Sequence, residues 1–363
     1  MADALDFVVD KTDLRHCAFV PGRHGPDTPL DAGQILVRVD RFGLTANNVT
    51  YGAVGDLVGY WGFFPAADGW GRIPVWGFAD VAASRHPGIT TGERLYGYFP
   101  MSTYALLQVD RVTPASFVDA AAHRAALPAF YNQYTRVAAD PGYASEREGE
   151  IAIFRPLFGT GFLLDAFLAA EGLFGARDVV LSSASSKTAL ALAFLLTSAR
   201  GQTCTVTGLT SAGNAAFVRG TGYYRRVVPY DDLASLSPDT PAVFVDFAGN
   251  ARLVAAVHTR LGSTLRHSAQ VGVTHWDRMG AAGELPGPAP VFFFAPDHLQ
   301  RQLAALGPAE FATRLGAAMQ RFLASTAPWL RLVEGRGPAA VEAVYRAMVD
   351  GRVNPAEGQV LSL

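Results

Sequence analysis

A run of small hydroxyl residues ending beside a lysine has the composition of a phosphate site. It covers residues 182–189, reads SSASSKTA, and contains one of only two lysines in the chain. Hydroxyl groups and backbone N–H groups donate hydrogen bonds to phosphate oxygens, and a lysine adds a point charge. We therefore expect a group of neighbouring residues to bind a phosphate: Ser183, Ser185, Ser186, Lys187 and Thr188.

The elements around this run predict where it lies in the fold. It follows a strand-like segment, residues 178–183, and precedes an Ala/Leu-rich helix, residues 188–200. Dinucleotide phosphates bind at such strand-to-helix turns, although serines there can also simply cap the helix. Two other motifs fit less well. A P-loop needs glycine where Leu181 and Ser186 stand, and an S-x-x-K hydrolase needs serine where Ala184 stands.

The segment after the next strand indicates which nicotinamide cofactor would bind. Residues 203–207 form that strand, and Thr210 and Ser211 follow it without the carboxylate that holds the ribose hydroxyls of NAD. Small hydroxyls here, with Arg219 or Tyr230 nearby, suit a 2′-phosphate. NADPH is therefore the expected form.

The chain has two regions with different sequence patterns. Residues 30–110 are rich in aromatic residues, glycine and proline, which predicts short strands in a compact barrel or sandwich. From residue 175, strands and helices alternate, which predicts a doubly wound parallel sheet with right-handed crossovers. The tail from residue 286 combines a β-like VFFF, helices at 311–326 and 339–350, and a final strand that could return to the first module.

Composition excludes several classes of protein. The 363 residues are 50 % hydrophobic and 17 % charged, and 30 basic residues face 32 acidic ones, so neither nucleic acid nor a membrane surface is an expected partner. Cys17 and Cys204 cannot form a disulfide framework. Residues 1–16 contain no signal-peptide core, and Asp165 and Glu171 interrupt the apolar stretch at 163–174. We expect a cytoplasmic protein.

Several short motifs resemble those of one superfamily in order and spacing. They are LVRV (36–39), FGLTANN (42–48), IPVWGFADV (73–81), GERLYG (92–97), LPAFYNQY (127–134), VLSSASSKTALA (180–191) and DFAG (246–249). Together they resemble the zinc-free medium-chain dehydrogenase/reductase superfamily, on its quinone-oxidoreductase and enoyl-reductase side. The serines and Lys187 stand where that superfamily has glycines.

The resemblance implies an α/β protein of two domains. A GroES-like β-barrel domain, residues 1–127 completed by 286–363, would join a Rossmann doubly wound parallel-sheet domain, residues 128–285, usually in a homodimer. Tyr230 and Gly249 match cofactor-binding positions, whereas Asn214 stands near the position of a lysine. No metal is implied, because cysteine and histidine are absent around Asn48 and from residues 65–80.

Hydride transfer to an enone or a carbonyl leaves negative charge on oxygen and needs a proton donor. The resemblance puts the turn after Asn48 under the nicotinamide, so Tyr51 is the expected donor, with Asn48 orienting the substrate oxygen. His275 follows a strand at the edge where such sheets bind ligands. Both Tyr51 and His275 could instead be structural, and the aromatic residues between 51 and 104 either fill the barrel core or line an apolar pocket.

The sequence therefore predicts an NADPH-dependent oxidoreductase. Its small-molecule substrate would be an apolar or aromatic activated alkene, quinone or ketone. Two alternatives stay open. One is a non-catalytic ligand-binding or scaffolding descendant of the fold, and the other is a reaction on a nucleotide-linked or acylated substrate in the same crevice without nicotinamide.

Overall fold

The computed structural model describes residues 4–272 and 285–363, and the chain forms two compact units. The first combines Met1–Ile153 with Leu332–Leu363, and the second is Phe154–Arg331. These bounds differ from the division at 127/128 and 285/286 expected from sequence. Barrel strands continue to Arg136, and the helices between residues 286 and 331 belong to the second unit.

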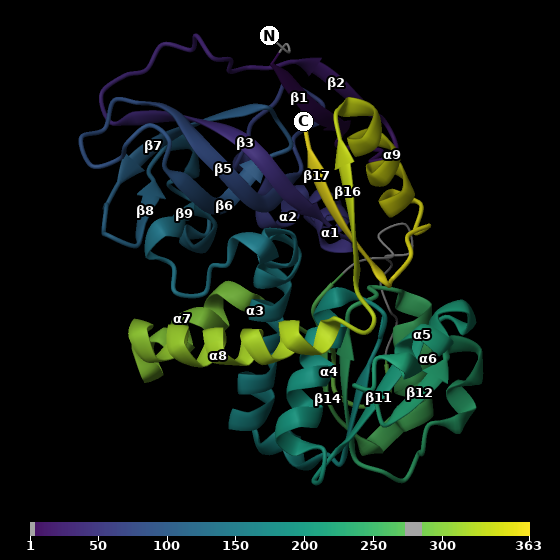
Figure 1. Ribbon diagram of the computed structural model, residues 1–363. Helices are drawn as coiled ribbons and strands as arrows, with labels where there is room; N and C mark the ends of the chain where they lie inside the picture. The colour runs from purple at the N-terminus through teal and green to yellow at the C-terminus, as the bar shows by residue number, and fades with distance from the viewer. Residues whose placement is uncertain (1–3, 273–284) are drawn as a thin grey trace. The chain divides into compact units, whose positions relative to one another are not determined.

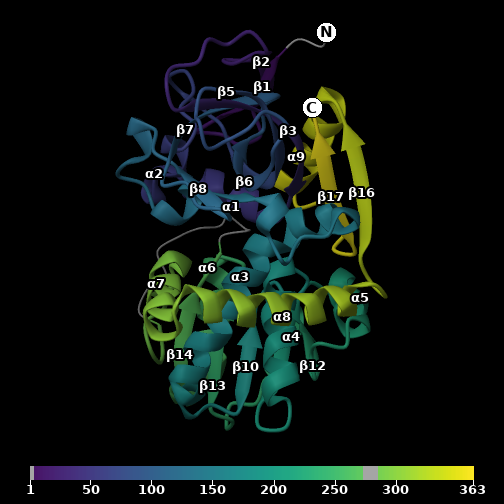
Figure 2. The same ribbon diagram turned by 60° about the vertical axis from the view of Figure 1, so that its left-hand side comes forward.

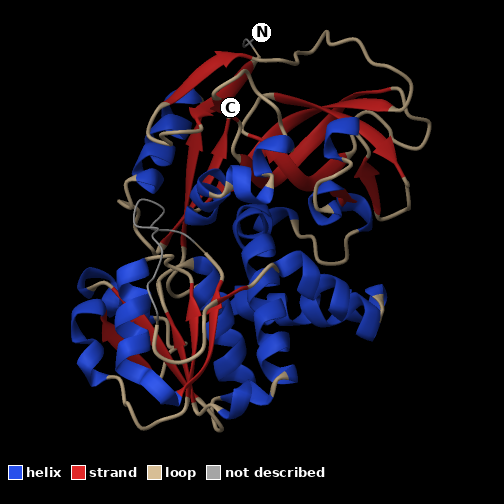
Figure 3. Ribbon diagram, turned by 180° about the vertical axis from the view of Figure 1, so that it is seen from behind, coloured by secondary structure: helices blue, strands red, loops and turns tan. Residues whose placement is uncertain are grey.

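The first unit is built around a closed antiparallel barrel, with strands drawn in red in Figure 3. The ring order is β3-β5-β6-β9-β8-β7, and it closes because β3 pairs with β7 as well as with β5. The six strands are β3 (Gln34–Leu44), β5 (Pro74–Ser84), β6 (Arg94–Pro100), β7 (Tyr104–Asp110), β8 (Ser116–Asp119) and β9 (Gln133–Arg136). This is the predicted GroES-like barrel, formed where glycines and aromatic residues alternate.

Segments from both ends of the chain complete the first unit. The last strand, β17, pairs with β3 outside the ring, and β16 lies beside β17. The elements from the chain ends are β1 (Leu5–Asp10), β2 (Cys17–Pro21), β16 (Arg331–Arg336), α9 (Pro338–Val349) and β17 (Glu357–Ser362). The segment between β3 and β5 adds α1 (Ala46–Ala53), α2 (Gly55–Val58) and β4 (Trp70–Gly71). Strands β2, β1 and β4 form a separate small sheet.

One long helix, α3 (Glu148–Ala170), follows the barrel in sequence. Together with the turn before it, this helix is long and apolar enough to cross a membrane, although more than half of its most apolar window is buried. Core helices of soluble proteins have the same composition. The helix is therefore longer than the interrupted stretch considered in the sequence.

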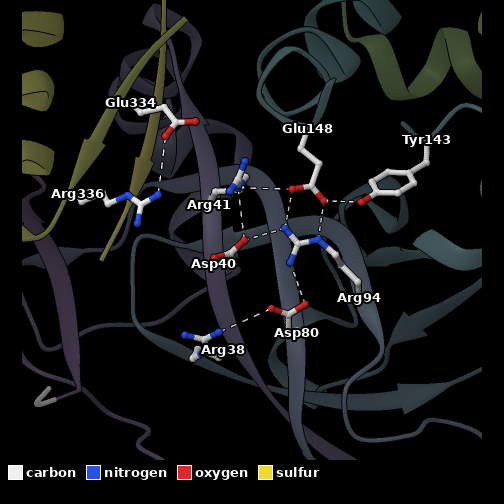
Figure 4. A network of polar contacts seen from close by, with 9 residues as sticks. All are labelled: Arg38, Asp40, Arg41, Asp80, Arg94, Tyr143, Glu148, Glu334 and Arg336. Atoms are coloured by element: carbon white, nitrogen blue, oxygen red, sulfur yellow. Dashed lines mark hydrogen bonds and ion pairs between the residues drawn. The ribbon is translucent and has the colours of Figure 1, made fainter. Parts of the chain in front are cut away.

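A network of ion pairs fixes the start of α3 to the barrel (Figure 4). Arg94 on β6 is its centre. The guanidinium lies 2.7 Å from Asp40 on β3, 2.8 Å from Asp80 on β5 and 2.5 Å from Glu148, the first residue of α3. Tyr143 donates a further hydrogen bond to Glu148 at 2.8 Å. One guanidinium thus joins three barrel strands to the helix.

The second unit is a six-stranded parallel sheet in the order β12-β11-β10-β13-β14-β15 (Figure 2). Helices flank it on both sides (Figure 1). Its strands are β10 (Asp178–Leu181), β11 (Thr205–Thr210), β12 (Arg226–Pro229), β13 (Ala242–Asp246), β14 (Leu265–Gln270) and β15 (Val291–Phe292). Its other described α-helices are α4 (Lys187–Arg200), α5 (Ala215–Gly220), α6 (Ala251–Leu261), α7 (Ala295–Leu306) and α8 (Pro308–Thr326).

This strand order is that of dinucleotide-binding Rossmann sheets, so the predicted fold class is confirmed. The order reverses between β10 and β13, where ligands bind at the carboxyl ends of the strands. The tail helix α8 packs on this unit, since the ring of Phe322 lies 5.1 Å from that of Phe158 on α3 and 5.4 Å from that of Phe194 on α4.

Candidate functional site

The turn between β10 and α4 contains a residue in the left-handed region. Ser183 has φ 45°, a conformation that glycine adopts most easily. Its backbone N–H donates to the hydroxyl of Tyr230 at 3.0 Å. Burial raises the pKa of Tyr230, so its phenol stays protonated at neutral pH. The structure therefore brings two predicted residues together, with Tyr230 supporting the turn.

Two further side chains hold the same turn. Asn214 donates to the hydroxyl of Ser185 at 3.1 Å, and Tyr224 donates to the carbonyl of Ala184 at 2.9 Å. The turn also packs tightly on β11, because a Cβ added to Gly208 would lie 2.8 Å from Cβ of Ala184. Tyr224 was not anticipated from the sequence, since no motif marks it.

The start of α4 combines a cap with the scarce lysine. The hydroxyl of Ser186 accepts a hydrogen bond from the N–H of Ala189 at 3.3 Å, so the capping interpretation is correct for this serine. Lys187 and Thr188 are the first two helical residues and are half-buried. The first N–H groups of a helix lack intrahelical partners and attract anions.

The residues predicted to follow β11 occupy different environments. Thr210, the last residue of the strand, is buried, and Ser211 is exposed. Arg219 lies at the exposed end of α5, and in the described part of the chain no hydrogen bond or ion pair joins it to the turn. The structure therefore brings Ser183 and Tyr230 together but leaves Arg219 outside that group.

A buried serine and aspartate lie across the point where the strand order reverses. The hydroxyl of Ser182 donates to Asp246 at 2.5 Å. Gly249 has φ 68°, and its N–H donates to the same carboxylate at 3.0 Å. The predicted Gly249 thus lies in the turn after β13 and binds the carboxylate of Asp246. Ser182 and Asp246 themselves were not selected as site residues from the sequence.

In the first unit, both polar atoms of the Asn48 amide are engaged. Its oxygen accepts from the N–H of Thr45 at 2.8 Å, and its nitrogen donates to the carbonyl of Pro74 at 2.9 Å. Tyr51 is buried one turn later, and its hydroxyl accepts from the indole of Trp76 at 3.3 Å. Burial raises the pKa of Tyr51 far above its usual value.

Tyr51 belongs to a buried cluster of aromatic rings. Tyr98 is the centre of this cluster and contacts five other rings: Tyr51, Phe63, Phe64, Trp76 and Tyr131. Trp61 is also core, because added Cβ atoms at Gly55 and Gly71 would lie 2.2 Å and 2.4 Å from its ring. Most aromatic residues of this region therefore fill the unit, which favours the core interpretation.

Two predicted features lie elsewhere. His275, the third expected catalytic residue, lies outside the described residues. Among the residues that the structure does describe, no group of three or more His, Cys, Asp or Glu side chains could hold a metal ion.

Comparisons with known proteins place this architecture. A family described as "Protein of unknown function (DUF2855)" matches residues 42–354, and no curated protein matches. The fold is similar to that of CurA from Vibrio vulnificus in complex with NADPH, with a TM-score of 0.61, 14 % identity and 99 % of each chain covered. The yhdH oxidoreductase from Salmonella enterica in complex with NADP gives 0.54, 16 % and 99 % of each chain.

A mutant form of enoyl thioester reductase from Candida tropicalis gives a TM-score of 0.54 at 10 % identity, with 100 % of each chain covered. At these identities the similarity shows the fold. The fold expected from the resemblance, a GroES-like barrel with a Rossmann sheet, is thereby confirmed.

Proposed function

The chain belongs to the DUF2855 family of proteins of unknown function, and we propose that it is an NADPH-dependent oxidoreductase. It would transfer a hydride to a small apolar or aromatic activated alkene, quinone or ketone. The observation that carries this proposal is the serine-lysine turn at the end of β10, beside the reversal of strand order.

The residues at this turn fit a dinucleotide. In the usual fingerprint, glycines allow a tight turn, close approach to the pyrophosphate and close helix packing. Here Ser183 makes the tight turn, and Ala184 packs against Gly208. Lys187 supplies the positive charge at the start of α4. Two similarly folded proteins were solved with NADPH and NADP, which supports the same class of ligand.

The end of β11 supports NADPH over NADH. Thr210 and Ser211 leave no carboxylate there to repel a 2′-phosphate or to hold the ribose diol of NADH. Arg219, on the exposed end of the following helix, would approach the 2′-phosphate on binding.

Tyr51 is the proposed proton donor to the reduced substrate. Burial raises the pKa of Tyr51, so the phenol keeps its proton at neutral pH and is a weaker acid than a free phenol. It would donate only to a strongly basic oxygen, such as the one that hydride transfer leaves on the substrate. Trp76 occupies an acceptor position of the hydroxyl and leaves the O–H group for another oxygen. Asn48 holds the start of α1 and so would position Tyr51.

We also propose a cytoplasmic homodimer. Among the described strands β15 is the last of the sheet, and its two side chains, Val291 and Phe292, are each 55 % exposed. An exposed apolar edge strand can pair with a second copy.

The cofactor proposal is tested by titrating the protein with NADPH and NADH and following fluorescence. Lys187→Ala should weaken NADPH binding at least tenfold, because losing a charge-assisted contact costs about 1.5–3 kcal/mol. The control is Lys11→Ala, which removes the other lysine, in the first unit. Unchanged affinity in Lys187→Ala would remove Lys187 from the site.

A non-catalytic binding protein is the second candidate. The observation in its favour is that Ser183 has a left-handed conformation without being glycine, so the turn departs from the usual cofactor fingerprint. The same titration separates the two, because the absence of any saturable change at millimolar NADPH or NADH would reject the oxidoreductase. A nucleotide-linked or acylated substrate would then be tested in the same assay.

A further inference from the structure

Ser182 and Asp246 join the two strand ends between which the order of the parallel sheet reverses. Ser182 follows β10 and Asp246 ends β13, and both side chains are at most 2 % exposed. A dinucleotide crosses a doubly wound sheet at this reversal. The pair therefore stands where the proposed cofactor would pass.

The hydrogen bonds around Asp246 define its chemical form. Ser182 Oγ accepts the N–H groups of Phe247 at 2.8 Å and Ala248 at 3.1 Å, and it donates its single proton to Asp246 at 2.5 Å. Asp246 also accepts the N–H groups of Ala248 and Gly249, each at 3.0 Å. Burial raises the pKa of Asp246, but the surrounding donors favour the carboxylate.

No cation balances this carboxylate among the residues that the structure describes. Asp178, at the opposite end of β10, offers a comparison. It accepts from the hydroxyl of Thr207 at 2.8 Å and lies 4.0 Å from the guanidinium of Arg226. Within the described part of the chain, Asp246 is therefore a buried negative charge stabilised by N–H and O–H dipoles alone.

The two strand-to-helix turns at the reversal consequently differ in charge. After β13, the N–H groups of residues 247–249 bind Ser182 and Asp246, and Asn250 caps α6 by accepting from Arg252 and Leu253. These donors are already used. The turn after β10 instead carries Lys187, so anionic groups of a ligand are directed to that turn.

We propose that Asp246 sets the oxidation-state preference of the site by favouring the cationic nicotinamide of NADP⁺ over the neutral ring of NADPH. This inference rests on the proposed function. Each half of a doubly wound sheet binds one nucleotide. If the phosphates bind at the turn after β10, the nicotinamide nucleotide would bind on the half of the sheet that begins with β13. The carboxylate attracts a cationic ring and has little net attraction for a neutral one.

This preference would also favour the forward reaction. If the oxidised form binds more tightly than the reduced form, the loss of a hydride from the bound cofactor becomes more favourable than in water. Asp246 would then act on the equilibrium of hydride transfer while remaining a positioning residue that touches neither substrate nor reacting atoms.

The test compares Kd for NADP⁺ and NADPH, measured by calorimetry, with thermal unfolding of the apoprotein. In Asp246→Asn, the ratio Kd(NADP⁺)/Kd(NADPH) should rise roughly tenfold, which corresponds to a loss of about 1.4 kcal/mol of attraction between the carboxylate and the cationic ring. Ser182→Ala keeps the charge and Asp178→Asn removes a buried carboxylate at the other end of β10. Both should leave the ratio unchanged, whatever they do to stability.

If Asp246→Asn does not fold, the double variant Ser182→Ala/Asp246→Ala takes its place. It removes both side chains of the Ser182–Asp246 hydrogen bond, so neither is left without its partner, and it should give the same shift in the ratio. The inference would be overturned by an unchanged ratio in the variant of Asp246 that folds, or by an equal shift in Asp178→Asn. Neither result would contradict the proposal that the protein binds NADPH. A wild-type protein that binds neither nucleotide would overturn the proposed function itself.

Discussion

Ser183 carries a Cβ in a conformation that costs an ordinary residue about 1–2 kcal/mol. The hydrogen bond from its N–H to Tyr230 helps to offset this cost. Asn214 holds the hydroxyl of the neighbouring Ser185, and Tyr224 holds the backbone carbonyl of Ala184. Individual side chains thus fix a backbone that glycine usually forms. The loss of glycine at this turn therefore does not mean the loss of its shape.

At Tyr51, replacement by phenylalanine removes only the hydroxyl. We expect kcat to fall by about 100-fold or more with an unchanged Kd for NADPH, since general acids contribute about 10²–10⁴-fold. Steady-state kinetics with a quinone or enone substrate would measure this. Tyr345→Phe is the matched control, because Tyr345 is also a buried tyrosine of the first unit and its hydroxyl donates to the carbonyl of Leu14. Equal rates for both variants would exclude Tyr51 as the donor.

His258 predicts a loss of stability in acid. It is fully buried between the carbonyl of Pro286 and the hydroxyl of Ser268, each 3.0 Å away, and burial lowers its pKa. The unfolded chain takes up a proton near pH 6.5 but the folded chain does not, so stability falls as the pH drops below about 6.5. Urea unfolding at pH 7.5 and 5.5 would show this.

The His258→Asn variant should lose less stability between these two pH values, because it cannot be protonated. His267 and His298 also have pKa values lowered by burial, so some dependence should persist. An identical fall in the variant and the wild type would assign the effect to other groups.

Among the elements, the connection from β10 through α4 to β11 depends on a close approach at Gly208. Alanine there would bring a Cβ within 2.8 Å of both Ala184 and Tyr224, in the layer that supports the nucleotide turn. We expect Gly208→Ala to destabilise the fold by about 1–3 kcal/mol and to weaken NADPH binding. Chemical unfolding and fluorescence titration would measure the two effects.

Gly220→Ala provides the control for Gly208→Ala. Gly220 ends α5, is exposed, and a Cβ added there would meet nothing within 4 Å. Normal NADPH affinity in Gly208→Ala would show that the turn tolerates displacement.

The elements that could be predicted from sequence are those with a local pattern. The helix predicted at 188–200 is α4, Lys187–Arg200, and α6, Ala251–Leu261, has the same kind of local pattern. Each has a side-chain cap and a glycine at its end. Helix α3 carries apolar residues on all faces and contains Pro156, so no amphipathic period marked it.

Closure of the barrel and the Ser182–Asp246 pair were beyond sequence patterns for a related reason. Strand β3 meets β7 about 70 residues later, and Ser182 meets Asp246 across 64 residues. Pairings of this length depend on the packing of the whole sheet. The serine-lysine turn and Tyr230 were identified from sequence, but the hydrogen bonds by which Tyr230, Tyr224 and Asn214 hold the turn come from distant elements and were not.

For the whole molecule, the exposed strand β15 leads to a prediction about assembly. Wild-type protein should have twice the 38.6 kDa mass of the chain in light scattering after gel filtration. Phe292→Asp should shift it to a single chain, because a charge would be buried without a partner. Leu57→Asp is the control, since Leu57 is exposed in the first unit. A wild-type monomer would contradict the homodimer.

The division of the first unit between the two ends of the sequence has a consequence for synthesis. The second unit is complete once Arg331 has left the ribosome, whereas β17, which pairs with β3, is made only at residues 357–362. The inserted Rossmann unit can therefore fold while the outer edge of β3 still waits for its partner. During translation, the unpaired edge of β3 is therefore where a chaperone or a neighbouring nascent chain would bind.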